Sequence, residues 1–234
     1  MLQDKIYEQP VKNLKFDKYI CKTYFQDMEF EDLQKIICEL ESNKYKSCGN
    51  LKLGRAGIIE IKIKNNEFVI RQYSRGGAVS GILKNKYLSE SRFIQEFYLL
   101  KILEEKKFKT VIPSFLIYYK CFPFFYSGYL ATYKLSGYIN FYDYIINNKT
   151  DFLKKRIDLF FKILVKISEL NYMGIYHTDI QLKNIMISND FNDIAIIDFD
   201  KGKIVKLKSK YYFAAMFYRF LRSLVKHSKT LNIV

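Results

Sequence analysis

Apolar residues recur every three or four positions in several stretches of the chain, which is the spacing of an amphipathic helix. We predict helices at residues 27–40, 90–104, 141–146 and 151–172, and a terminal helix around residues 213–226. Gly174 directly follows the longest of these helices and is placed to cap it. Residues 1 to about 44 are expected to hold only the first helix and loops. In the long helix, we expect a broad apolar face formed by Ile157, Phe160, Phe161, Leu164, Ile167, Ser168 and Leu170.

Other stretches favour β-strands. Residues 58–63 alternate between apolar and polar side chains, and residues 68–73 form a second short apolar run. Residues 110–133 are rich in Phe, Tyr, Leu and Ile, but lysine, proline and glycine interrupt them. Their apolar runs are far below the roughly 20 residues that a membrane-spanning helix needs. We therefore predict two aromatic strands joined by a turn near Pro123, and no transmembrane helix.

The charge of the chain points to an anionic partner. Its 234 residues carry 39 Lys and Arg against 24 Asp and Glu, a formal net charge of +15. Such an excess suits nucleic acid, an acidic membrane surface or a phosphorylated substrate, and charge alone does not choose among them. The four cysteines include no C-x-x-C pair, so we expect free thiols in a reducing cytoplasm. The first residues have no apolar core, so we expect no signal peptide.

The candidate chemistry lies in the second half of the chain. His177, Asp179 and Asn184 fit the pattern H-x-D-x-x-x-x-N, and Asp198 follows fourteen residues later, directly before Phe199. Phosphoryl transfer needs one carboxylate at the attacking hydroxyl, and an amide and a second carboxylate for the metal ions. Asp179 fits the first role, and Asn184 and Asp198 fit the second. The alternative, a surface loop and a strand that ends in Asp by chance, is disfavoured by the combined spacing. His177 is expected to shape the loop rather than to carry a proton.

A second group of residues suits the phosphates of a nucleotide. Gly54 and Gly57 lie in a turn between two predicted strands, where main-chain N–H groups can approach phosphate oxygens, although a plain hairpin explains them equally well. Arg71 occupies the strand position at which kinases usually have a lysine. Glu96 on the following helix is its candidate partner, and a solvated helical glutamate is the alternative. Arg75 precedes two glycines in a loop that could carry a cation to the phosphates or form a simple turn.

Together these residues resemble the bacterial 3-deoxy-D-manno-octulosonic acid (Kdo) kinases of the lipopolysaccharide kinase family. The resemblance lies in R-Q-Y-S-R-G-G at residues 71–77, in the helix with Glu96, in residues 177–184 and in I-D-F-D-K-G at residues 197–202. It extends over most of the chain from about residue 49 onward. It also makes an arginine at position 71 an expected feature.

The resemblance implies an α+β, two-lobed protein-kinase-like fold. A small β-rich N-lobe with a helical lead-in would cover residues 1–132, and a truncated helical C-lobe would cover residues 133–234, with residues 130–137 as the connection. The sequence explains the truncation, because no Ala-Pro-Glu follows Asp198 and residues 201–234 contain nine Lys or Arg and no Asp or Glu. This leaves no room for the activation segment and peptide-docking helices of a protein kinase.

The resemblance also implies an activity. It is ATP- and Mg²⁺-dependent phosphorylation of a Kdo hydroxyl, the 4-OH, on a Kdo–lipid A precursor. The enzyme would act in the cytoplasm, peripherally on the anionic inner face of the bacterial inner membrane, with no nucleic acid and no obligate protein partner. Arg71, held by Glu96, would bind the nucleotide phosphates beside Gly54 and Gly57. Lys183 and Arg75 would offset charge on the transferring group or the acceptor.

Three alternatives stay open from the residues. The closest is another small-molecule kinase of the same fold, acting on a core heptose or an aminoglycoside-like acceptor. A non-catalytic kinase-like binding module is disfavoured by the presence of Asp179, Asn184 and Asp198 together. A nucleic-acid binder would use the net charge, but the chain has no aromatic and basic recognition motif to support it.

Overall fold

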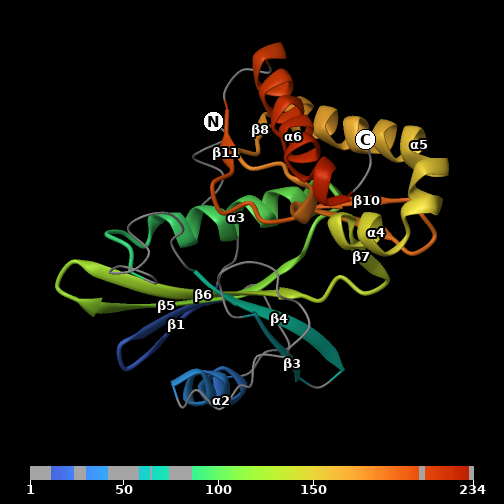
Figure 1. Ribbon diagram of the computed structural model, residues 1–234. Helices are drawn as coiled ribbons and strands as arrows, with labels where there is room; N and C mark the ends of the chain where they lie inside the picture. Colours follow the sequence, from blue (N-terminus) through green and yellow to red (C-terminus); the bar gives the residue numbers. More distant parts are fainter. Residues whose placement is uncertain are drawn as a thin grey trace. The chain divides into compact units, whose positions relative to one another are not determined.

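The computed structural model describes residues 12–23, 30–41, 58–63, 65–73, 86–205 and 209–231 (Figure 1). The chain divides into two compact units, one made of Met1–Lys101 and Ile112–Lys134 and the other of Ile102–Val111 and Leu135–Val234. The first unit contains an antiparallel sheet and the second is mainly helical, which confirms the predicted α+β class. Residues 130–133, which were expected in the connection between lobes, instead end a strand of the sheet.

The sheet of the first unit has six strands, in the order β1-β2-β5-β6-β4-β3, with every neighbouring pair antiparallel. The predicted strands at residues 58–63 and 68–73 and the aromatic pair are confirmed. The expectation of loops ahead of the first helix was wrong, because a hairpin forms there and pairs with β5. The strands are β1 (Lys12–Phe16), β2 (Tyr19–Thr23), β3 (Ile58–Ile63), β4 (Asn66–Gln72), β5 (Pro113–Phe122) and β6 (Phe125–Tyr133).

Helices α2 (Phe30–Glu41) and α3 (Ser91–Glu105) lie on opposite sides of this sheet (Figure 1). Both helices were predicted. Helix α2 contributes buried residues such as Leu33 to the core cluster that also holds Phe68 and Phe115 of the sheet. On the α3 side, the rings of Phe93 and Tyr73 have centroids 4.4 Å apart. Gly128 of β6 leaves room for this contact, because a Cβ there would lie 3.1 Å from the Phe93 ring.

In its described residues, the second unit combines the α-helices α4, α5 and α6 with two small sheets, ordered β10-β9-β7 and β11-β8. The predicted helices at residues 141–146, 151–172 and 213–226 are confirmed. Within the described residues, no helix is both long and apolar enough to cross a membrane. The elements are β7 (Tyr138–Asn140), α4 (Phe141–Asn147), α5 (Lys149–Tyr172), β8 (Ile175–Tyr176), the 3-10 helix η2 (Leu182–Asn184), β9 (Ile185–Ser188), β10 (Ile194–Ile196), β11 (Lys203–Ile204) and α6 (Lys210–Leu231).

Helix α5 buries only part of the predicted face, since Ile167 and Leu170 are buried as expected. Ile157 and Phe161, which were expected to be buried, are 78% and 65% exposed. The apolar residues of α5 occur on more than one side of the helix, so their spacing alone does not identify the face that packs. The end of the helix is as predicted, since Gly174 adopts φ +71° and its N–H donates to the carbonyl of Asn171. The residues that α5 does bury are Phe152, Leu159, Ile163, Ile167 and Leu170.

Candidate active site

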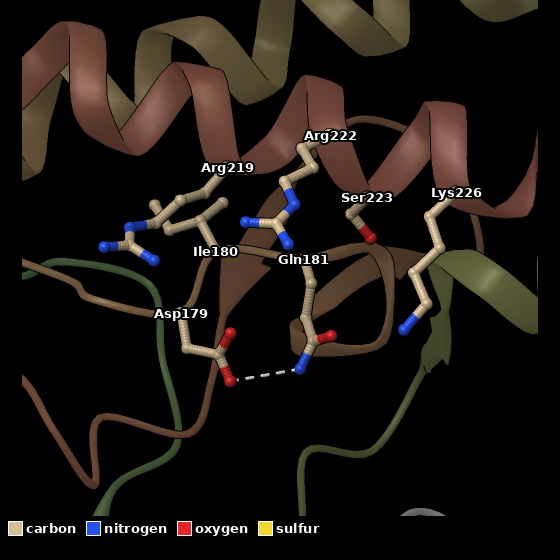
Figure 2. A pocket seen from close by; sticks show the side chains of 7 residues that line it. All are labelled: Asp179, Ile180, Gln181, Arg219, Arg222, Ser223 and Lys226. Atoms are coloured by element: carbon tan, nitrogen blue, oxygen red, sulfur yellow. Dashed lines mark hydrogen bonds between the residues drawn. The ribbon is translucent and has the colours of Figure 1, made fainter.

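Every second residue of the loop that carries Asp179 is buried, and these residues hold the loop in place. It begins after β8, and the side chains of Ile180 and Leu182 are fully buried. The N–H of Leu182 donates to the Ser223 hydroxyl of α6 over 3.1 Å. Because Ile180 and Leu182 point into the core, Asp179 stays exposed and Gln181 half-buried. The amide of Gln181 donates to the Asp179 carboxylate over 3.2 Å (Figure 2).

His177 is buried beneath this loop, and its ring makes two hydrogen bonds. Its Nδ1 accepts from the N–H of Asp179 over 3.1 Å, so Nδ1 carries no proton. Its Nε2 lies 3.1 Å from the carbonyl of Ile197 and donates to it. Burial lowers the pKa of His177, and the hydrogen bond to Ile197 only partly opposes this. The ring is therefore neutral with the proton on Nε2, and it ties the Asp179 loop to the strand end before Asp198.

Asn184 connects the same two segments. Its side-chain Nδ2 donates to the main-chain carbonyl of Asp179 over 2.9 Å. Its own carbonyl accepts from the N–H of Ile197 over 2.9 Å, continuing the β9–β10 ladder by one residue. One hydrogen-bonded network in the second unit thus connects Asp179, Asn184 and the residue before Asp198.

Asp198 lies at a backbone turn directly after this ladder. It adopts φ +66°, in the left-handed region that Asp tolerates better than most residues. The following Phe199 is buried against the His177 ring, with centroids 4.6 Å apart. This buried anchor fixes the position of the turn and keeps the Asp198 side chain half-buried rather than in the core.

The side-chain oxygen atoms of Asn184 and Asp198, which flank β9 and β10, suit a hard cation. Since Nδ2 of Asn184 is occupied by Asp179, the amide oxygen is the atom that remains to bind a metal. Mg²⁺ takes oxygen ligands and is commonly held by one or two protein groups together with phosphate oxygens and water. An amide oxygen from Asn184 and a carboxylate from Asp198 fit that pattern. Among the described residues, no group of three or more His, Cys, Asp or Glu side chains forms a metal site made of protein ligands alone.

In the first unit, Arg71 of β4 and Glu96 of α3 form the ion pair that the sequence suggested. Nη2 of Arg71 lies 2.6 Å from Oε1 of Glu96. The Glu96 side chain is buried and that of Arg71 is about one quarter exposed. The guanidinium also lies over the ring of Tyr73, at 5.1 Å from its centroid. The pair fixes the arginine, and its role towards a nucleotide stays a prediction.

The remaining predicted residues are outside the described residues or on the surface. Gly54, Gly57 and Arg75 lie outside the described residues. Lys183 is exposed in η2, with its ammonium 4.9 Å from the centroid of the Tyr142 ring.

A pocket that the sequence did not predict lies beside Asp179. It has a volume of about 230 Å³ and combines the Asp179 loop with one face of α6 (Figure 2). The available signal is the helical spacing of Arg219, Arg222 and Lys226 in the sequence. The residues that line this pocket, called here the α6 pocket, are Asp179, Ile180, Gln181, Arg219, Arg222, Ser223 and Lys226.

Comparisons with known proteins agree with this chemistry. The sequence model of the "Lipopolysaccharide kinase (Kdo/WaaP) family" matches residues 39–230. Proteins named 3-deoxy-D-manno-octulosonic acid kinase from two strains of Vibrio vulnificus, YJ016 and CMCP6, are each 30% identical over 152 residues. These matches span 63% of this chain and 61% of each relative.

Among solved structures, "WaaP in complex with acyl carrier protein" has a similar fold. Its TM-score is 0.51 at 11% sequence identity, over 79% of this chain and 73% of that one. At this identity the likeness concerns the fold alone.

Proposed function

The chain belongs to the lipopolysaccharide kinase (Kdo/WaaP) family, and we propose that it transfers phosphate from ATP to a hydroxyl of Kdo, the 4-OH, on a Kdo–lipid A precursor. A kinase of this family is a phosphotransferase that acts in lipopolysaccharide synthesis. The choice of Kdo rests on the two relatives of that name and on the motifs at residues 71–77 and 197–202.

The observation that carries this proposal is the network around Asp179. Two hydrogen bonds fix the backbone of this residue, one from its N–H to His177 and one to its carbonyl from Asn184. Asn184 in turn pairs with the strand end that precedes Asp198. A carboxylate set on a rigid, hydrogen-bonded loop beside two oxygen donors is the arrangement that phosphoryl transfer requires.

In this proposal Asp179 acts as the general base. Its exposed carboxylate receives the proton of the sugar hydroxyl as the oxygen attacks phosphorus, and ADP leaves. The amide of Gln181 donates to the carboxylate and orients it. Asn184 and Asp198 would hold Mg²⁺, and this cation would neutralise the charge that develops on the phosphoryl group supplied by ATP. His177 stays neutral throughout and keeps the loop in position.

Arginine and lysine residues complete the proposed machinery. We assign the nucleotide phosphates to Arg71, because its ion pair with Glu96 holds the guanidinium in one place. Arginine presents a planar fork that matches phosphate oxygens. Gly54 and Gly57 are assigned to the same phosphates by resemblance. Lys183 and Arg75 would offset negative charge on the transferring group or on the acceptor.

We further propose that the protein works on the cytoplasmic surface of the inner membrane. Residues 201–234 carry nine Lys or Arg and no acidic residue. Each basic residue near an anionic surface contributes about 1 kcal/mol to binding. Such a segment would bring the enzyme to a lipid-linked acceptor without a spanning helix. No nucleic acid or obligate protein partner is needed for this function.

The test is to incubate the purified protein with Mg·ATP and a Kdo–lipid A acceptor and to analyse the product by mass spectrometry and NMR. The proposal predicts the gain of one phosphate, located on the 4-OH of Kdo. A parallel reaction with a heptose-containing core acceptor separates the alternatives. Phosphate on the heptose alone would keep the kinase activity and reject Kdo as the acceptor. No transfer to either would reject the proposed function.

A further inference from the structure

The α6 pocket lies next to the proposed base, but none of the roles above uses its basic residues. The Asp179 loop forms one wall of this pocket and α6 forms the other. Figure 2 shows the side chains of Arg222 and Lys226 extending from α6 towards the side on which Asp179 and Gln181 lie. A group bound by these two cations would therefore sit close to the carboxylate that receives the proton.

The residues of this wall share one face of α6, and the face is attached to the Asp179 loop. Arg219, Arg222, Ser223 and Lys226 follow each other at intervals of three, one and three residues, which places them on one face of the helix. Ser223 is buried on this face, and its hydroxyl accepts the hydrogen bond from the N–H of Leu182. This bond fixes the register of the helix against the catalytic loop. The backbone positions that carry the cations are therefore fixed relative to the Asp179 loop.

The pocket carries an excess of positive charge. Within the part of the chain that the structure describes, no carboxylate forms an ion pair with Arg219, Arg222 or Lys226, and the hydroxyl of Tyr176 is the polar contact of Arg219. Asp179 is the single acidic residue of the lining. Helix α6 itself contains no Asp or Glu. Three cations around one carboxylate leave the pocket ready for a further anion.

Neighbouring residues extend this positive region. Lys183 and His227 both contact the ring of Tyr142, Lys183 at 4.9 Å and His227 with a centroid distance of 5.0 Å. The pKa of His227 is lowered, first by burial and then by the charges of Lys183 and Lys226. The histidine is therefore a neutral member of a cationic surface that continues the pocket along α6.

The volume of the pocket limits what can bind. At about 230 Å³, it is smaller than the roughly 300–1,000 Å³ of pockets that enclose drug-sized ligands. It can hold one charged group or one sugar unit, but not a set of acyl chains. Arg222 and Lys226 are exposed, so a group carried on a larger molecule can reach them.

From these observations we propose that the α6 pocket is the acceptor subsite, in which Arg222 and Lys226, with Arg219, bind an anionic oxygen group of the acceptor beside Asp179. The group is a carboxylate or phosphate on or next to the sugar that is phosphorylated. This inference rests on the proposed function, because it gives a binding site to the acceptor of that reaction. The cations would hold the acceptor so that its hydroxyl faces the Asp179 carboxylate.

The test compares the double variant R222Q/K226Q with the wild type, in detergent solution without a membrane. The control is K154Q, which removes an exposed lysine of α5 far along the chain from the pocket lining. We expect the KM for a Kdo–lipid A acceptor to rise about 10-fold or more per lost cation, with the KM for ATP unchanged. K154Q should stay within about 2-fold of the wild type. The charge-retaining variant R222K/K226R should recover most of the loss.

Modified acceptors identify the anion. On an acceptor whose carboxyl is reduced to an alcohol, the wild type and R222Q/K226Q should have similar KM values if the bound group is the carboxylate. The same convergence on a dephosphorylated acceptor would identify a phosphate. An unchanged KM of the double variant on the native acceptor, or an equal penalty on all three acceptors, would overturn the inference and leave the proposed function standing.

If the wild type transfers no phosphate, the proposed function fails and the pocket is tested by binding alone. Calorimetry would then compare free Kdo with its methyl ester. Preference for the free acid that is lost in R222Q/K226Q supports an anion subsite. Equal binding of acid and ester by the wild type rejects a carboxylate in the subsite, and inorganic phosphate that binds the wild type no better than R222Q/K226Q rejects a phosphate there.

Discussion

The side-chain Nδ2 of Asn184 donates to the main-chain carbonyl of Asp179 over 2.9 Å, so the proposed metal ligand also supports the loop of the proposed base. The two functions use opposite atoms of one amide. Nitrogen holds the loop, and oxygen is left for the cation. Asn184 is buried, so the hydrogen bond cannot simply be replaced by water.

Because the two ends of the Asn184 amide have different roles, we predict that aspartate at this position destabilises the protein more than alanine does. N184A should lower the free energy of unfolding by about 1–3 kcal/mol, because a buried carbonyl loses its donor. N184D restores an oxygen for the metal, but it sets a buried carboxylate against the carbonyl of Asp179 and should cost more. Urea unfolding at pH 8 compares the free energies of unfolding of N184A and N184D. A more stable N184D than N184A at that pH would contradict the arrangement.

The ion pair of Arg71 and Glu96 gives a second prediction. R71M leaves the Glu96 carboxylate buried without its cation, and we expect a loss of about 2–4 kcal/mol in the free energy of unfolding. The double variant R71M/E96L removes both charges and should be more stable than R71M. Denaturant titration of the wild type, R71M, E96L and R71M/E96L gives the coupling energy. Additive effects of the two substitutions would show that the pair is not coupled.

The arrangement of the proposed catalytic residues was predictable because they are close in sequence. Residues 177 to 198 form one loop and two adjacent strands. Ile185 pairs with Ile196 at the end of the β9–β10 ladder, and this pairing brings Asn184 next to the residue before Asp198. The Arg71–Glu96 contact was predicted from the strand position at which kinases usually have a lysine and from the helix that follows it. It links residues on different elements, whose facing directions the sequence alone leaves open.

The misses share a physical cause, which is dependence on contacts distant in sequence. The hairpin of β1 and β2 has only five residues per strand, interrupted by lysines, and it completes the sheet by pairing Cys21 with Ile117 of β5. In α5, exposed Ile157 and Phe161 have the same apolar character as the buried residues. The α6 pocket needs the packing of Ser223 on Leu182, which no local pattern predicts.

The turn after α5 gives a third prediction, with a matched glycine as control. Gly174 has φ +71°, and a Cβ there would lie 2.9 Å from the carbonyl oxygen of Val205. Gly137 has φ +77° with open space around its Cα. Both alanine variants bear a conformational cost of about 1–2 kcal/mol, and G174A adds a steric clash with backbone. Thermal unfolding should therefore rank G174A clearly below G137A, and equal midpoints would contradict the close approach.

His177 predicts a pH dependence of stability. Burial lowers its pKa in the folded protein, whereas the unfolded chain has the ordinary value of about 6.5. As the pH falls below about 6.5, the unfolded state binds a proton that the folded state does not, so stability decreases. Above that pH the contribution is fully present.

The measurement is the free energy of unfolding between pH 5 and pH 8. H177Q removes the titrating group and should flatten the decrease below pH 6.5. H227Q removes the other histidine of the chain, which is only partly buried, and should keep most of the decrease. An unchanged pH profile in H177Q would show that His177 is not the group responsible.

The most direct test of the account is phosphate transfer to a Kdo–lipid A acceptor by D179N, measured beside D143N, which alters an exposed aspartate at the start of α4. Asparagine keeps the size of the side chain and cannot take the proton of the hydroxyl. The account predicts that D179N folds normally and loses about 10²–10⁴-fold in kcat, while D143N retains wild-type turnover. Turnover of D179N close to that of the wild type would contradict the assignment of Asp179 as the base.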